Sequence, residues 1–118
     1  MARPNILECG NIFGNTAVLA ITTSATAITA NPAGSNKTYK INALYISNVD
    51  GTNAAEASVD IYRENTAYHI ARTVVVPPDT TLDVISKSVY LLEGDSLRLT
   101  SNSISDLEAV CSFEELQL

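Results

Sequence analysis

Apolar and polar residues alternate along short segments between residues 40 and 115, and Pro, Gly, Asp or Asn residues separate these segments. Clear examples are 58–62 (SVDIY), 80–84 (TTLDV) and 96–100 (SLRLT). Such alternation places one set of side chains on a buried face and the other set in water. Several such strands at regular spacing are typical of a sandwich or barrel. We therefore expect an all-β fold without helices: a single antiparallel β-sandwich, immunoglobulin-like or jelly-roll, of about eight or nine strands.

The longest predicted strand, residues 38–48, changes its phase. Tyr39 and Ile41 share one face, whereas Leu44 and Ile46 fall on the other. This switch predicts either a β-bulge near Asn42 or a strand that is buried on both faces. The following Asp-Gly pair in residues 48–53 predicts a turn with positive φ angles.

Residues 11–36 contain no charged side chain. Within them, residues 16–22 and 24–29 are rich in Thr, Val and Ile and are predicted to form strands. Exposed edge strands are usually protected from pairing with other chains by Lys or Pro, and neither occurs in these two strands. We therefore expect that they either lie inside a sheet or are covered by another subunit.

The N-terminal residues differ from the rest of the chain. Residues 1–15 lack sustained periodicity and contain Pro4, Gly10 and Gly14, so we interpret them as an extended arm before a sandwich domain of residues 16–118. The arm either folds back onto its own domain or docks on a neighbouring subunit. Its candidate interface residues are the large apolar ones, Ile6, Leu7, Ile12 and Phe13.

Composition narrows the classes of partner. The chain has 118 residues, a net charge of −6 and scattered basic residues, which argues against binding to nucleic acid. No apolar stretch is long enough for a membrane-spanning helix, and no signal-peptide pattern follows the first residues. The charged fraction of 17% is low, which indicates that part of the surface is covered by another molecule.

The sequence offers little catalytic chemistry. His69 is the only histidine, and no nucleophile motif accompanies it, so we interpret it as a partly exposed strand residue. Oxygen donors in residues 48–53 and 93–95 suit Ca²⁺, but the same residue types form tight turns. We expect no enzymatic activity, no metal and no cofactor. Whether Cys9 and Cys111 form a disulfide is left open by the sequence.

A glycan-binding module is the principal alternative. Sugar sites commonly present aromatic faces, and the chain has five Tyr residues. Tyr39 and Tyr45 share parity on one predicted strand unless a bulge intervenes, while Tyr62 and Tyr68 flank a predicted hairpin turn. Aromatic residues on strands are, however, more often packed in the core or against cross-strand neighbours.

An ordered series of segments resembles small β-sandwich structural proteins of tailed bacteriophages, notably phages of marine cyanobacteria. The segments are 31–41 (NPAGSNKTYKI), 44–51 (LYISNVDG), 76–82 (VPPDTTL), 92–98 (LEGDSLR) and 107–115 (LEAVCSFEE). The resemblance implies a non-enzymatic virion protein present in many copies as a homo-oligomer. Its partners would be other virion proteins, either the major capsid protein or neck and tail proteins. The alternative is a receptor- or glycan-binding module of a tail fibre.

Overall fold

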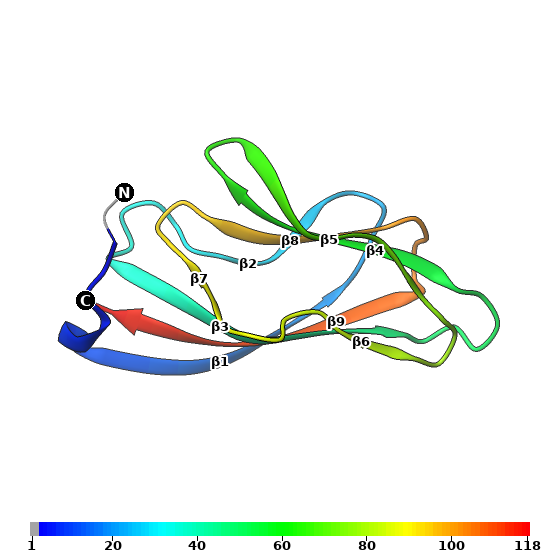
Figure 1. The fold of residues 1–118 in the computed structure, drawn as a ribbon, viewed down its shortest axis with the longest axis horizontal. Coiled ribbons are helices and arrows are strands. Elements are labelled where there is room, and N and C mark those ends of the chain that lie inside the picture. Colours follow the sequence, from blue (N-terminus) through cyan, green and yellow to red (C-terminus); the bar gives the residue numbers. More distant parts are fainter. Residues whose placement is uncertain (1–2) are drawn as a thin grey trace.

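The computed structural model describes residues 3–118, which form an elongated sandwich of two antiparallel sheets, 49 × 27 × 19 Å (Figure 1). The expected all-β sandwich of eight or nine strands is confirmed, because the described residues contain nine. They are β1 (Asn11–Ala20), β2 (Thr26–Ala30), β3 (Lys37–Asn48), β4 (Ala55–Arg63), β5 (Thr66–Val76), β6 (Thr81–Asp83), β7 (Val89–Leu91), β8 (Ser96–Ser101) and β9 (Leu107–Gln117). One short 3₁₀ helix, η1 (Ile6–Glu8), precedes them.

The strand order identifies the sandwich as a jelly roll. One sheet has the order β1-β9-β3-β6, with β7 also paired to β3, and the other has the order β2-β8-β4-β5. Strands β6 and β7 pair with opposite ends of β3 and are two parts of one interrupted strand. With these parts counted as one strand, each sheet has four strands, and successive strands alternate between sheets except within the β4–β5 hairpin. The immunoglobulin-like alternative is therefore wrong.

The phase change in β3 is a β-bulge. The register with β9 shifts between Ile41 and Ala43, as the sequence predicted. Both Ile41 and Leu44 consequently point into the core and are fully buried. The interruption between β6 and β7 lies opposite this bulge, where Val84 N–H donates to the Leu44 carbonyl (3.0 Å).

The core lies between the two sheets and is formed by alternate residues. On β9 these are Leu107, Ala109, Cys111 and Phe113, all buried, in agreement with the alternation of the sequence. Strands β3, β4 and β8 contribute most of the remaining aliphatic side chains. Every buried polar side-chain atom of residues 3–118 has a hydrogen-bond partner, which is typical of a uniquely packed domain.

The turn prediction for residues 48–53 is confirmed only in part. Residues 48–53 do form a connection, but Gly51 does not have a positive φ angle, so that part of the prediction is wrong. The carboxylate of Asp50 instead accepts hydrogen bonds from the N–H groups of Thr52 (2.8 Å) and Asn53 (3.2 Å). Positive φ angles occur in the β4–β5 hairpin, at Glu64 (51°) and Asn65 (62°), the pattern of a type I′ turn.

The N-terminal arm is shorter than the sequence suggested. Residues 11–15 belong to β1 and pair with β9 from Asn11 opposite Gln117 onwards. The part of the arm outside the sandwich strands therefore ends before Asn11, and residues 1–2 lie outside the described residues. The segment that follows them crosses the end of the sandwich where the C-terminus also lies (Figure 1).

Candidate assembly surface

The two charge-free strands are both edge strands. Strand β1 ends one sheet and β2 ends the other, and the two are in contact. Of the two alternatives that the sequence left open, a position inside a sheet is therefore wrong. The first six residues of β1 are all exposed, and no other segment of residues 3–118 pairs with its outer edge. A ten-residue edge without charge, Pro or bulge is an open template for pairing with another chain.

The free main-chain groups of β1 can be assigned from its register. Ile21 N–H donates to the Leu107 carbonyl (2.9 Å), in register with the β1–β9 pairing. Because the hydrogen-bonding direction alternates along a strand, the odd-numbered residues of β1 bond to β9. The N–H and C=O groups that point away from the sheet are those of the even-numbered residues Ile12, Gly14, Thr16, Val18 and Ala20.

An apolar row crosses the outer face of the same sheet. Val18 of β1, Val110 of β9 and Tyr45 of β3 are neighbours in register, and they are 74%, 41% and 43% exposed. A hollow of about 270 Å³ lies beside Val18 and Val110. Exposed apolar side chains in neighbouring positions are typical of a face that contacts another molecule.

The four candidate interface residues are exposed. Ile6, Leu7, Ile12 and Phe13 are 45%, 92%, 61% and 51% exposed. Helix η1 buries none of its residues. Asn5 caps this helix by accepting a hydrogen bond from Leu7 N–H (3.1 Å), so the exposed apolar residues are held in a defined local structure. The structure does not bring Ile6 and Leu7 into the core of their own domain.

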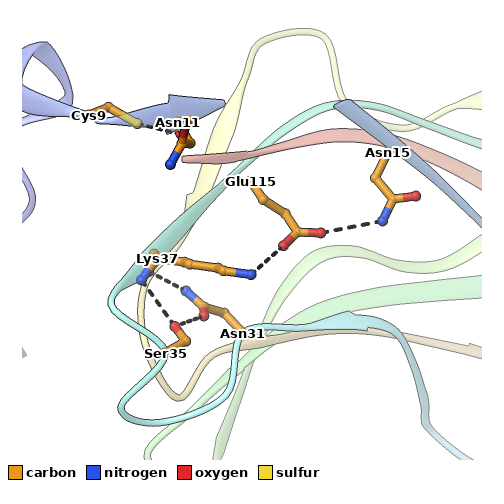
Figure 2. A network of polar contacts seen from close by, with 7 residues as sticks. All are labelled: Cys9, Asn11, Asn15, Asn31, Ser35, Lys37 and Glu115. Atoms are coloured by element: carbon orange, nitrogen blue, oxygen red, sulfur yellow. Dashed lines mark hydrogen bonds and ion pairs between the residues drawn. The ribbon is translucent and has the colours of Figure 1, made fainter. Parts of the chain in front are cut away.

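Of the three carboxylates on β9, the strand that pairs with β1, one is bound to a lysine, whereas no ion pair of residues 3–118 includes Glu108 or Glu114. Glu115, one strand further in, binds Lys37 (3.0 Å) and accepts a hydrogen bond from Asn15 of β1 (3.4 Å) (Figure 2). The hydrogen bond and the charge of Glu115 raise the pKa of Lys37. The carboxylate therefore does not present an unpaired negative charge at this edge.

The two cysteines are free and cannot form a disulfide within the chain. Cys9 lies beside the end of β9 and contacts the Gln117 carbonyl (3.2 Å). Cys111 is six residues further along β9, roughly 20 Å away at the rise of an extended strand, whereas a disulfide needs Cα atoms within about 7 Å. Cys111 is fully buried, and this burial raises the pKa of its thiol to about 11.

The residues considered for catalysis, metal binding and sugar binding do not lie together in one site. His69 lies exposed on β5. No group of three or more His, Cys, Asp or Glu residues within residues 3–118 is placed to hold a metal ion. The bulge in β3 separates Tyr39, which stacks on Phe113 in the core (5.4 Å), from the exposed Tyr45. Tyr62 packs under the guanidinium of Arg98 (3.9 Å), whereas Tyr68 is exposed on the neighbouring strand.

A second hollow, of about 350 Å³, lies at the end of the sandwich where the arm crosses. It is lined by Arg3, Pro4, Ile6, Thr38, Arg63, Tyr90 and Leu92. The described residues contain no helix with the length and hydrophobicity that crossing a membrane would require.

Comparison with known proteins establishes the fold. No family model and no curated protein matches the chain. A solved structure of Bacillus endospore appendages, described as disulfide-linked pili, aligns with a TM-score of 0.54 at 14% identity, over 100% of this chain and 97% of the other. Two structures of a pentameric capsid protein isolated from metagenomic phage sequences align with TM-scores of 0.48 and 0.46. They are 23% and 21% identical over 86% of this chain, and the aligned part is 62% and 60% of theirs. The likeness to the pilus structure, at 14% identity, shows a shared fold alone.

Proposed function

We propose that this chain is a non-enzymatic structural protein of a tailed-phage particle, localised in the virion. It either decorates or cements the capsid or forms an accessory ring at the neck or tail. The observation that carries the proposal is the long, uncharged and exposed edge of β1, which lies next to an apolar arm that is not packed into its own core. Monomeric proteins protect such edges, whereas subunits of an assembly have them covered by neighbours.

In this role the chain would act through contacts with other copies of itself and with other virion proteins. The rigid sandwich holds β1 and the arm in place, and Ile6, Leu7, Ile12 and Phe13 contact a neighbour. Apolar side chains that are exposed in the free subunit then become buried in the assembly. The resemblance of five ordered sequence segments to phage structural proteins supports the same interpretation, while a jelly roll alone does not decide a function.

The first test is quantitative mass spectrometry of purified particles of the virus that encodes the chain, with the major capsid protein as reference. Copies on the order of hundreds per particle support a place on the capsid, and roughly 5 to 20 support a ring at the neck or tail. Absence from the particles refutes the proposal, and a glycan array would then test the tail-fibre alternative.

A second test addresses the arm. Leu7→Asp places a charge on the most exposed apolar residue of the arm, and Ile104→Asp makes the same type of change in the loop before β9, at the opposite end of the sandwich. Both variants should keep the melting temperature of the parent. Only Leu7→Asp should reduce incorporation into particles, and equal incorporation of both variants would remove the arm from the interface.

A further inference from the structure

We propose that β1 pairs antiparallel with β1 of a second copy across a two-fold axis, which joins the two β1-edged sheets into one continuous sheet. This inference rests on the assembly role proposed above and names the partner of the β1 edge. Unpaired N–H and C=O groups of β1 point away from the sheet. They belong to Ile12, Gly14, Thr16, Val18 and Ala20.

The other edges of the sandwich are poor partners for β1. Strands β6 and β7 have three residues each, and β2 has five residues with a register shift against β8. Strand β5 is long, but its pairing with β4 shifts twice, and Thr73 within it has a positive φ angle of 48°. The only long edge without a register shift in residues 3–118 is β1, so another β1 matches its length and regularity best.

The arm of another copy is also a poor partner. Its residues before β1 include Pro4, which lacks an N–H group, and the 3₁₀ turn Ile6–Glu8, which is not extended. Repulsion between two copies at the β1 edge is smaller than the net charge of −6 suggests. Residues 11–36 carry no charge, and on β9 Glu115 is bound to Lys37 (Figure 2), so the charges one strand behind the edge are those of Glu108 and Glu114.

The exposed side chains select one register. In an antiparallel pair, residues opposite each other point to the same face of the sheet, so the even-numbered residues of the two copies are opposite each other. Placing Ile12 opposite Val18 of the second copy brings two exposed apolar side chains into contact on both sides of the axis. Asn15 then faces Asn15 of the second copy at the axis, and roughly eight main-chain hydrogen bonds form.

Proline at position 16 separates this pairing from the fold of the subunit. The Thr16 N–H points away from β9, so Thr16→Pro removes a hydrogen bond to the second copy without removing one to β9. Thr16→Val keeps the N–H group and is the matched control. Sedimentation should give twice the monomer mass of 12.6 kDa for the parent and for Thr16→Val. The dimer dissociation constant of Thr16→Pro should rise by at least about tenfold.

Cysteine cross-linking tests the register and remains informative if Thr16→Pro does not fold. In a Cys9→Ser background, Asn15→Cys should oxidise to a covalent dimer, because opposite residues of this type of pair have Cα atoms about 4.5 Å apart. Thr16→Cys faces Gly14 of the second copy and should cross-link far more slowly. Faster cross-linking of Thr16→Cys overturns this register, and a parent chain that stays monomeric at millimolar concentration overturns the dimer.

The outcomes separate this inference from the proposed function. If particles contain the chain but Thr16→Pro is incorporated as well as Thr16→Val, the β1 pairing is wrong and the virion role stands. If the isolated chain dimerises through β1 but is absent from particles, the pairing stands and the virion role is wrong.

Discussion

The carboxylate of Asp95 provides a quantitative test of how the ends of the strands are held together. Its side chain is completely buried and accepts hydrogen bonds from Arg63 Nε (2.8 Å), Arg63 Nη2 (2.5 Å) and Leu92 N–H (2.8 Å). Arg63 is the last residue of β4, and its side chain is 38% exposed. Its hydrogen bonds to Asp95 raise the pKa of Arg63 above the ordinary value. The pair therefore connects the β4–β5 hairpin to the turn before β8.

The two partners should not be equally costly to remove. Arg63→Ala leaves a fully buried carboxylate with one main-chain donor, a class of change that costs about 3–5 kcal/mol. Because the arginine is more than a third exposed, water can partly replace it, and we expect a value near the lower limit, about 3 kcal/mol. Asp95→Ala leaves Arg63 free to turn toward water but removes the acceptor of Leu92 N–H, for about 2 kcal/mol.

Urea unfolding at neutral pH measures both values, followed by far-UV circular dichroism and by tyrosine fluorescence, since the chain has no Trp. A loss of about 3 kcal/mol should lower the urea midpoint by roughly 1–3 M. Arg72→Ala, at an exposed arginine of the same hairpin, is the control and should stay within about 0.5 kcal/mol of the parent. If Arg63→Ala matches Arg72→Ala, or if Asp95→Ala is the costlier change, the reasoning from burial is wrong.

Three further predictions follow from the core, the thiols and the loop at residues 48–53. Leu99→Ala creates a cavity at a fully buried position of β8 and should cost about 3 kcal/mol in urea unfolding. Ellman's reagent at pH 8 should modify Cys9 in the folded protein and Cys111 only after unfolding, because burial raises the Cys111 pKa to about 11. Hydrogen bonds to the Asp50 carboxylate, of which the one from Thr52 N–H has the largest effect, lower its pKa below the ordinary value of 3.8. The stabilisation that the ionised carboxylate provides is therefore present above pH 3.8 and is lost as the pH falls further. Asp50→Asn should therefore reduce the acid dependence of the melting temperature, and an unchanged dependence would contradict this assignment.

Local alternation predicts those parts of the fold that depend on burial. The inward residues of β9 and the bulge of β3 are both visible in the sequence, because a buried face forces apolar residues into phase. The bulge at Asn42 is visible because Ile41 and Leu44 could not otherwise both be buried. A jelly roll, in contrast, differs from an immunoglobulin-like sandwich in long-range pairing, which local patterns do not encode.

The predictions from the sequence are wrong where strand pairing or side-chain hydrogen bonds, rather than burial, determine the local structure. Residues 11–15 are strand because they pair with β9, yet they are exposed, so no burial pattern marks them. The Asp-Gly pair suggests positive φ, but the carboxylate of Asp50 forms the turn by accepting main-chain N–H groups. The sequence identifies the candidate interface residues only as large apolar side chains among polar ones. The structure adds that these side chains are exposed.

The jelly-roll strand order determines where the charge-free segment lies in the molecule. Strands that follow each other along the chain alternate between the sheets here, so β1 and β2 become neighbouring edges on one side of the sandwich. A single run of residues without charge, 11–36, therefore supplies an edge strand to each of the two sheets. The opposite edge, at β5, carries His69 and Arg72 and is interrupted by register shifts. This asymmetry between the two edges is what an assembly subunit needs if it pairs through β1 and not through β5.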